Sequence, residues 1–167
     1  MNDVSSILSI SESIKISLCD KAMFAYPMEC CGLLVGHRTS FCDKKDTNNI
    51  TISSSVSTNN LAINPDRAFE IDPVTHITLI RNLRSQMMSC DFYEQIVGHY
   101  HSHPDSSSLP SINDLTRATI AETVWLIISI SSDGIGDIDA WKAVSGKNSR
   151  IEFQKMRIQN ITTSCLE

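Results

Sequence analysis

The chain has 167 residues, of which 41% are hydrophobic and 20% charged, and its formal net charge is −5. This length is enough for one domain with a continuous core but too short for a (β/α)8 barrel. The acidic balance and the lack of any Lys/Arg-rich segment argue against nucleic-acid binding, and no apolar run approaches the 18 residues of a membrane helix. We therefore expect a single domain over residues 1–167 with no nucleic-acid or membrane partner.

Two further features indicate a cytoplasmic protein. The N-terminal segment MNDVSSILSISES has no basic region and no cleavage site of a signal peptide. Two of the six cysteines are adjacent and none forms a C-x-x-C pair, which favours reduced thiols over disulfides. The cysteines are Cys19, Cys30, Cys31, Cys42, Cys90 and Cys165.

The first half of the chain predicts two helices and two strands. After a short apolar stretch at residues 7–10, Ser11 is a typical N-cap, and apolar residues recur at helical spacing until Pro27 (Ile14, Leu18, Ala22 and Ala25). Residues 30–35 and 51–57 read as strands, separated by a polar loop at residues 37–49. Pro73 suits the first turn of a second helix. We expect the apolar face of that helix to cover the sheet (Ile77, Ile80, Leu83 and Met87).

The second half alternates strands with a further helix. Strands are predicted at residues 95–102, 124–130, 139–144 and 151–158, with a turn at Ser145-Gly146-Lys147-Asn148 between the last two. A helix opens at Ser111. Strands interleaved with helices predict an α/β fold with a mixed sheet flanked by helices, and there is no internal repeat.

The stretch GHYHSHPDSSSLPSINDL, residues 98–115, carries the candidate chemistry. Residues i and i+2 of a strand project from the same face, so His101 and His103 point together, and His99 joins them only if the strand stays regular. Pro104 ends the strand, and Ser111 as N-cap places Asp114 in the first helical turn. That carboxylate can face back toward the two imidazoles.

Two imidazoles and a carboxylate are three of the four ligands of a catalytic zinc site, whose open fourth position takes water. Zinc lowers the pKa of bound water to about 7 and polarises a carbonyl, as hydrolysis requires. An isolated H-x-H pair is common without a metal, and S-x-x-D is a common helix cap. The occurrence of both, with ten residues between His103 and Asp114, makes metal binding the better interpretation.

The string H-S-H-P-x6-S-x-x-D, from His101 to Asp114, resembles the signature of the JAMM (MPN+) zinc metallopeptidases. Upstream, the segment PMECCGLLVG at residues 27–36 is similar to their P-x-E-x-C-G-L-L-x-G motif. Between the motifs, Asn60-Leu61-Ala62 and Phe69-Glu70-Ile71-Asp72-Pro73 resemble the connecting region of compact prokaryotic members, so the likeness covers about residues 7–144. The position of Trp141 agrees with it.

This resemblance implies a compact MPN domain, similar in fold to cytidine deaminases, with one zinc ion per chain. His101, His103 and Asp114 would be the zinc ligands, and Glu29 the general acid/base acting on the zinc-activated water. Ser111 would donate a hydrogen bond to the tetrahedral oxyanion. His99 has no ligand role in the family and is taken as a supporting or packing residue, and His37 and His76 as structural or exposed.

The reaction that the resemblance implies is isopeptidase or deubiquitinase-like hydrolysis after the C-terminal glycines of a ubiquitin-like or sulfur-carrier protein. An E1-like activating enzyme encoded nearby would be a partner of such a pathway. Two alternatives remain open: a non-catalytic MPN scaffold that binds proteins, and a RadC-like protein with another substrate. Zinc deaminases need a P-C-x-x-C motif that is missing here, and H-x-H amidohydrolases need a barrel that the chain is too short to form.

Overall fold

The computed structural model describes residues 6–39, 49–86, 94–147 and 150–162. In chain order the elements of these ranges are β1 (Ile7–Ser11), α1 (Glu12–Ala25), β2 (Cys31–Thr39), β3 (Asn49–Thr58), α2 (Pro73–Gln86), β4 (Gln95–Pro104), α3 (Ile112–Arg117), β5 (Val124–Ser131), β6 (Gly134–Ser145) and β7 (Ile151–Ile161). Met87, Cys42, Cys90 and Cys165, which entered the sequence-based predictions, lie outside the described residues.

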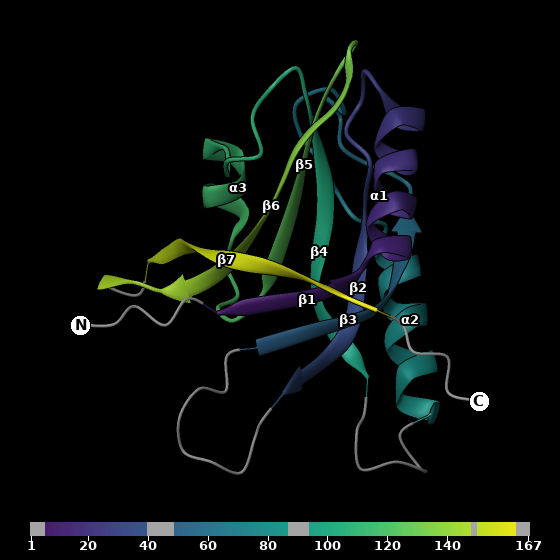
Figure 1. The fold of residues 1–167 in the computed structure, drawn as a ribbon, viewed down its shortest axis with the longest axis vertical. Helices are drawn as coiled ribbons and strands as arrows, with labels where there is room; N and C mark the ends of the chain where they lie inside the picture. The colour runs from purple at the N-terminus through teal and green to yellow at the C-terminus, as the bar shows by residue number, and fades with distance from the viewer. Residues whose placement is uncertain (1–5, 40–48, 87–93, 148–149, 163–167) are drawn as a thin grey trace.

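The strands form one sheet that closes on itself in the order β1-β3-β2-β4-β5-β6-β7. β1 runs parallel to β3 and β7, and β4 runs parallel to β5, whereas the other neighbours are antiparallel. Figure 1 shows β1, β3 and β7 crossing the direction of β4 and β5, with α1 and α2 on one side and α3 on the other. The predicted mixed sheet is confirmed, but it is closed and richer in strands than expected.

Closure depends on β1, which the sequence revealed only as a short apolar stretch. β1 lies between β3 and β7, and its Leu8 and Ile10 are completely buried. Five residues are too few for alternation to identify a strand with certainty. Ser11 ends β1 and also caps α1, where its Oγ accepts a hydrogen bond from the Ile14 N–H at 3.3 Å. The predicted N-cap is therefore confirmed.

Several strands extend beyond their predicted ends, and β2 and β6 do so by the largest number of residues. β2 passes through Gly36 to Thr39, with a register shift between Val35 and Gly36. The predicted loop is wrong for residues 37–39 and Asn49, and residues 40–48 lie outside the described ranges. β6 begins at Gly134, five residues before the predicted strand. The extra residues of β2 are polar or glycine, and those of β6 alternate glycine or aspartate with Ile135 and Ile138 too briefly to indicate a strand, so pairing with a neighbouring strand keeps both segments extended.

The sheet separates two groups of buried side chains. The larger group joins α1 to the inner face of the strands and includes Leu18, Leu34, Tyr100 and Leu126. At Gly32 a side chain would collide with the Tyr100 ring and the Val56 carbonyl oxygen, which explains the glycine of the C-G-L-L segment. The smaller group lies on the outer face and consists of Cys31, Phe69, Ala118, Trp125 and Ala143.

The two longer helices pack differently. α1 buries Leu18 and Ala22, as its spacing predicts, whereas no residue of α2 is buried. Ile77 of α2 is 50% exposed, and Ile80 and Leu83 line a cavity rather than a filled core. The prediction that α2 covers the sheet therefore holds only in part. Within the described ranges, neither these helices nor α3 combines the length and apolar character needed to cross a membrane.

Candidate metal centre

The two predicted histidines meet on the outer face of β4. β4 pairs with β2 and β5 along the segment that carries His101, so the strand stays regular there. His101 is fully buried and His103 is 5% exposed. Their Nε2 atoms lie 3.0 Å apart. The i, i+2 spacing thus brings both imidazoles to one point, as predicted.

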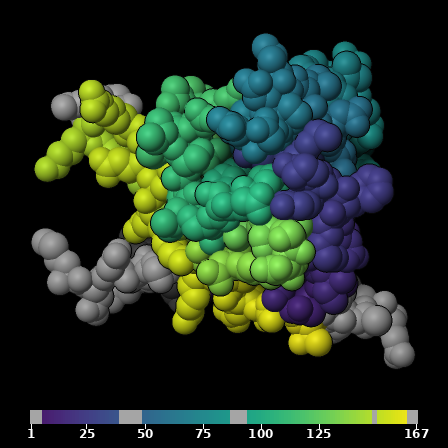
Figure 2. All heavy atoms as spheres, turned by 90° about the horizontal axis from the view of Figure 1, so that it is seen from above, coloured from purple at the N-terminus to yellow at the C-terminus, as the bar shows by residue number. Residues whose placement is uncertain are grey.

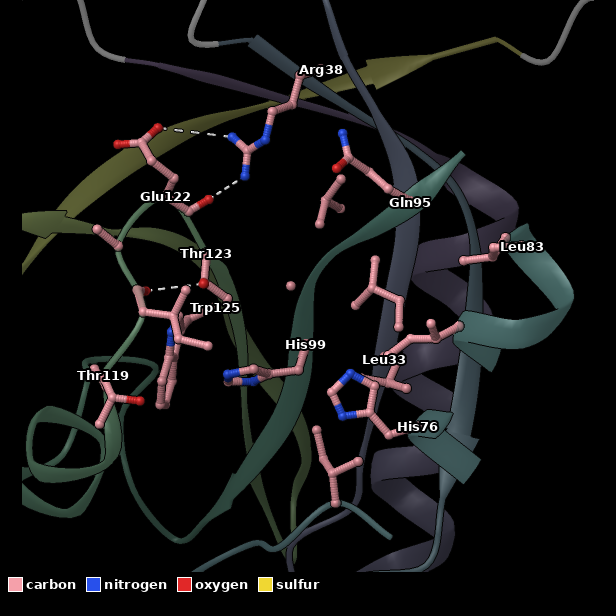
Figure 3. A pocket seen from close by; sticks show the side chains of 18 of the residues that line it. Leu33, Arg38, His76, Leu83, Gln95, His99, Thr119, Glu122, Thr123 and Trp125 are labelled. Atoms are coloured by element: carbon pink, nitrogen blue, oxygen red, sulfur yellow. Dashed lines mark hydrogen bonds and ion pairs between the residues drawn. The ribbon is translucent and has the colours of Figure 1, made fainter. Parts of the chain in front are cut away.

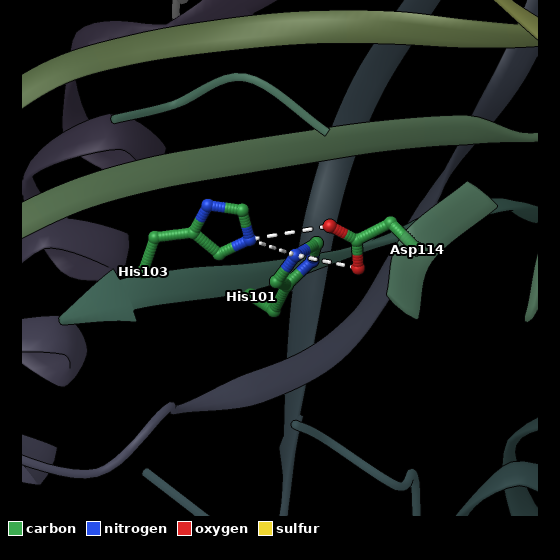
Figure 4. A group of neighbouring side chains, drawn as sticks. All are labelled: His101, His103 and Asp114. Carbon is green, nitrogen blue, oxygen red and sulfur yellow. Dashed lines mark hydrogen bonds and ion pairs between the residues drawn. The ribbon is translucent and has the colours of Figure 1, made fainter. Parts of the chain in front are cut away.

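The aspartate comes from the first turn of α3. Asp114 Oδ1 lies 3.3 Å from His101 Nε2, and Asp114 Oδ2 lies 3.3 Å from His103 Nε2 (Figure 4). Ser111 is the N-cap of α3, and its Oγ accepts the Asp114 N–H at 3.1 Å. The Ser111 N–H and Oγ–H donate to Asp114 Oδ2 at 2.6 and 2.7 Å. The capping box, which was the blander interpretation of S-x-x-D, is the device that aims Asp114 at the histidines.

The loop between β4 and α3 orients the second imidazole. His103 Nδ1 lies 2.8 Å from the Ser107 carbonyl oxygen, an acceptor only, so Nδ1 carries a proton and Nε2 points to the cluster. The neighbours of Ser107 are anchored: the Trp141 Nε1–H donates to the Ser108 carbonyl at 2.9 Å, and Ser129 Oγ donates to the Ser106 carbonyl at 2.6 Å. Trp141 therefore helps to hold the loop that orients His103.

An aromatic layer supports the first imidazole. The Phe69 ring stacks on His101 with centroids 4.3 Å apart and planes at 23°, and Trp125 meets the same imidazole edge-on at 6.0 Å. His99 packs against Trp125 at 4.1 Å and Phe69 at 5.1 Å. Burial lowers the pKa of His99 to about 3. His99 is thus a neutral packing residue, consistent with the absence of a ligand role.

The charges of the cluster are unequal. Burial lowers the pKa of His101. Burial would also lower the pKa of His103, but hydrogen bonding to Asp114 and to the Ser107 carbonyl outweighs this and raises it. Burial would raise the pKa of Asp114, yet hydrogen bonds from His101, His103 and Ser111 hold it well below its usual range. An ionised carboxylate beside imidazole lone pairs is a cation-binding arrangement.

Glu29 lies in the turn between α1 and β2 and is 7% exposed. Burial raises the pKa of its carboxyl to about 7; nearby His103 opposes this rise and Asp114 adds to it. Oε2 is buried with no hydrogen-bond partner among the described residues. Figure 2 looks down on this end of the molecule, where the segment after β4 lies between the end of α1, the segment after β3 and the β5–β6 turn.

A cavity of about 640 Å³ lies on the same side of the sheet, toward the N-terminal ends of β4 and β5, and is not lined by His101, His103 or Asp114. His99 and Trp125 face it from the sheet, and His76 and Leu83 face it from α2 (Figure 3). Arg38 crosses its far end and donates to the Glu122 carbonyl oxygen. His76 is exposed, as expected, and His37 is a half-buried residue of β2.

The donor set suits zinc. One atom from each of His101, His103 and Asp114 lies within 4.8 Å of the others, and all three residues are buried. Two imidazole nitrogens and one carboxylate oxygen match a three-ligand catalytic zinc site. His101 Nδ1 is buried and has no hydrogen-bond partner among the described residues, so, unlike His103, this imidazole is oriented by ring packing.

Sequence reasoning gave no role to several supporting residues. Phe69 and Asn60 were noticed only as part of a family resemblance, and Ser102 only as a letter of the motif. Ser102 is fully buried, and its Oγ accepts the Cys30 N–H at 2.8 Å, which joins the segment after Glu29 to β4. The position of Ser102, a polar residue between two candidate ligands, could have indicated that its side chain has a supporting role.

Comparison with known proteins gives a family match and a similar curated protein. Residues 11–144 match the family model of prokaryotic homologs of the JAB domain. Over 103 residues the chain is 32% identical to a desampylase of Haloferax volcanii, an alignment that covers 62% of this chain and 63% of the desampylase. The chain thus matches less than two thirds of that relative's length.

Two solved structures share the fold. A solution structure from Desulfitobacterium hafniense matches with a TM-score of 0.70 at 21% identity, covering 93% of this chain and 95% of the other. A solution structure from Salinibacter ruber matches with a TM-score of 0.62 at 23% identity, covering 93% of each chain. At these identities the likeness concerns the fold alone.

Proposed function

Because the chain belongs to the family of prokaryotic JAB-domain homologues, the JAMM (MPN+) group, we propose that it is a zinc-dependent isopeptidase. Its reaction would be hydrolysis of the amide bond after the C-terminal glycines of a ubiquitin-like or sulfur-carrier protein. We place this activity in one domain with one zinc ion per chain, in the cytoplasm, with an E1-like activating enzyme as a pathway partner.

One observation carries the proposal: a buried carboxyl group, Glu29, lies beside a buried cluster of metal-binding residues. The Glu29 carboxyl is close enough to His103 and Asp114 for both to affect its pKa. A protein-binding scaffold has no need of a carboxyl whose buried Oε2 finds no hydrogen-bond partner in the described part of the chain, since leaving such an atom unpaired costs stability. This arrangement favours the enzyme over the scaffold alternative.

In the proposed reaction His101, His103 and Asp114 would hold the metal. Zinc bound there would lower the pKa of a water molecule, polarise the scissile carbonyl and favour the ionised form of nearby Glu29. Glu29 would take a proton from the attacking water and pass it to the leaving amine. Burial raises the pKa of Glu29 to about 7 and the charge of zinc would lower it, so the carboxyl would be ionised and able to accept the proton.

Ser111 supports two roles. In this structure its hydroxyl hydrogen points to Asp114 Oδ2, so it positions a ligand. Rotation of that hydroxyl hydrogen toward a tetrahedral oxyanion would leave Asp114 Oδ2 with the bond from the Ser111 N–H. The proposed oxyanion contact is thus compatible with an intact cap.

The similarity to a desampylase supports a ubiquitin-like protein as the substrate. To test this, the purified chain is assayed for zinc content and for cleavage of ubiquitin-like and sulfur-carrier proteins joined through a Gly-Gly tail. We expect one zinc per chain and cleavage after the last glycine. A zinc-loaded protein that leaves all such fusions uncut would contradict the proposed substrate class.

The decisive variant is Glu29→Gln, which has the same shape but cannot accept the proton. We expect kcat to fall by about 10²- to 10⁴-fold, the usual contribution of a general acid/base, with zinc content and the unfolding midpoint retained. Glu70→Gln is the matched control, because Glu70 is exposed and enters the interactions of the site only through its backbone. A non-catalytic scaffold would cleave nothing in either form.

A further inference from the structure

Asn60, directly beyond β3, uses its whole side-chain amide. Its Nδ2 donates to the carbonyl oxygens of Glu29 and Ala68, and its Oδ1 accepts the N–H groups of Ala62 and Glu70, all at 3.0 Å. A side-chain amide has two donor hydrogens and two acceptor lone pairs. All four bonds go to backbone groups, so Asn60 fixes the course of the chain around it.

One of these bonds reaches the proposed catalytic carboxyl. The Glu29 carbonyl accepts from Asn60, and the Glu29 N–H donates to the Pro65 carbonyl at 2.7 Å. Both backbone polar groups of Glu29 are therefore held by the segment 60–65 rather than by the sheet. Within the described ranges, Oε2 of Glu29 makes no hydrogen bond that could orient the side chain. Its direction thus depends on where the backbone is held.

The same amide closes the loop that carries Phe69. Asn60 and Ile71 form a β-bridge, and the Leu61 N–H donates to the Glu70 carbonyl at 2.9 Å. These contacts hold the two ends of the loop together. The loop then places the Phe69 ring on the His101 ring, with the ring centroids 4.3 Å apart. The backbone of Glu29 and the aromatic support of His101 therefore share one anchor, Asn60.

The loop also contacts α3, but without the help of Asn60. Asn113 Nδ2 donates to the Arg67 carbonyl at 3.2 Å, and Arg117 donates to the Phe69 carbonyl. Loss of the Asn60 amide would therefore free the Glu29 carbonyl, while the loop stays attached to the helix of Asp114 and, through the Pro65 carbonyl, to the Glu29 N–H. The structure thus allows the two connections to be tested separately.

We propose that Asn60 is a positioning residue of the active site, which holds the Glu29 backbone at the distance from the His101–His103–Asp114 cluster that proton transfer requires. This inference rests on the proposed function. It assigns Asn60 no contact with substrate or metal, so its loss should affect kcat and not zinc binding.

The test is Asn60→Ala in the full chain, with Asn59→Ala as the matched control. Asn59 is the neighbouring residue of the same type, is exposed, and accepts hydrogen bonds from described residues through its backbone carbonyl and not its side chain. We expect Asn60→Ala to lower kcat by about a hundredfold, the cost of a misplacement of about 1 Å, with zinc stoichiometry and KM retained. Asn59→Ala and Asn113→Ala should keep the wild-type kcat.

A double-mutant cycle with Glu29→Gln separates positioning from general destabilisation. If Asn60 acts through Glu29, the hundredfold effect disappears in the Glu29→Gln background under single-turnover conditions. An equal loss of activity in both backgrounds, or an unchanged kcat in Asn60→Ala, would overturn the inference.

Amide hydrogen exchange on the metal-free protein gives a readout that needs no substrate. Asn60→Ala should speed exchange at the N–H groups of Glu29 and Ala62, whereas Asn59→Ala should not. If wild type cleaves no substrate but this difference is seen, the proposed function fails and the positioning role stands. If wild type cleaves its substrate and exchange at Glu29 is unchanged by Asn60→Ala, only the inference about Asn60 fails.

Discussion

The two ends of β4 present opposite kinds of surface on the same face of the sheet. Toward its C-terminal end, His101 and His103 are buried, meet Asp114, and are supported by Phe69 and the Ser107 carbonyl. Toward its N-terminal end, the sheet faces a cavity of about 640 Å³ beneath α2, a helix with no buried residue. The C-terminal end carries the candidate metal cluster, and the N-terminal end borders an unfilled cavity.

The difference shows where this fold is expected to be rigid. A site that must hold three ligand atoms in place needs side chains locked by packing and hydrogen bonds, and each ligand of the cluster has such support. A helix without buried side chains contributes little packing and belongs to the less stable part of a structure. Substitutions at the two ends should therefore differ strongly in effect.

The largest effect is expected at the ligand shared by both imidazoles. Asp114→Asn keeps the size of the side chain, and its amide oxygen can still accept the Ser111 N–H, so α3 stays capped. The amide offers the cluster no negative charge. We expect the variant to lose zinc on purification and to lose hydrolysis with it, as measured by metal analysis and by cleavage of a Gly-Gly fusion.

Asp105→Asn is the control for this substitution. Asp105 follows the same strand, but it is exposed and accepts a hydrogen bond from the Tyr26 hydroxyl at 3.2 Å outside the cluster. It should retain one zinc per chain. Zinc retained by Asp114→Asn at the wild-type affinity would show that the metal lies elsewhere.

A smaller effect is expected from the aromatic support. Phe69→Ala removes a buried ring from the contact with His101 and Trp125, and should lower the free energy of unfolding by about 3 to 5 kcal/mol. Zinc affinity should fall by about 10- to 100-fold, as for other residues that hold a ligand from behind. Urea denaturation and chelator competition measure the two effects.

Phe24→Ala is the control, because Phe24 is 94% exposed on α1 and should change stability by less than about 0.5 kcal/mol. An equal stability loss in both variants would mean that burial of Phe69 contributes nothing. Unchanged zinc affinity in Phe69→Ala would mean that His101 is oriented without the stack.

The same contrast separates what could be predicted from sequence and what could not. The meeting of His101, His103 and Asp114 was predictable, because strand and helix-cap geometry fix the direction of each side chain locally. The proposed role of Asn60 was not, since it depends on a hydrogen bond to the carbonyl of Glu29, 31 residues earlier in the chain. Such long-range hydrogen bonds leave no periodic pattern.

The fold shows the same limit. The N-cap at Ser11 and the start of α2 at Pro73 follow from local rules and were predicted correctly. Closure of the sheet by β1 depends on pairing with β3 and β7, which are about 40 and 150 residues away along the chain. The apolar residues of α2 recur at the spacing of a helix, but this spacing does not reveal whether other side chains pack against them.

The smallest effect is expected on α2, in comparison with α1. Both helices have 14 residues, but Leu18 of α1 is 1% exposed and Ile77 of α2 is 50% exposed. Leu18→Ala should lower the free energy of unfolding by about 2 to 5 kcal/mol because it leaves a cavity in the core. Ile77→Ala should change it by less than about 0.5 kcal/mol, since alanine has the higher helix propensity and little burial is lost.

Denaturant unfolding at two protein concentrations measures both variants. A loss of more than about 1 kcal/mol for Ile77→Ala at low concentration would mean that the α2 face packs on the rest of the chain in solution and that the cavity beneath it is closed there. A loss that appears only at high concentration would indicate instead that α2 is covered by a second copy of the chain, because association makes stability depend on concentration.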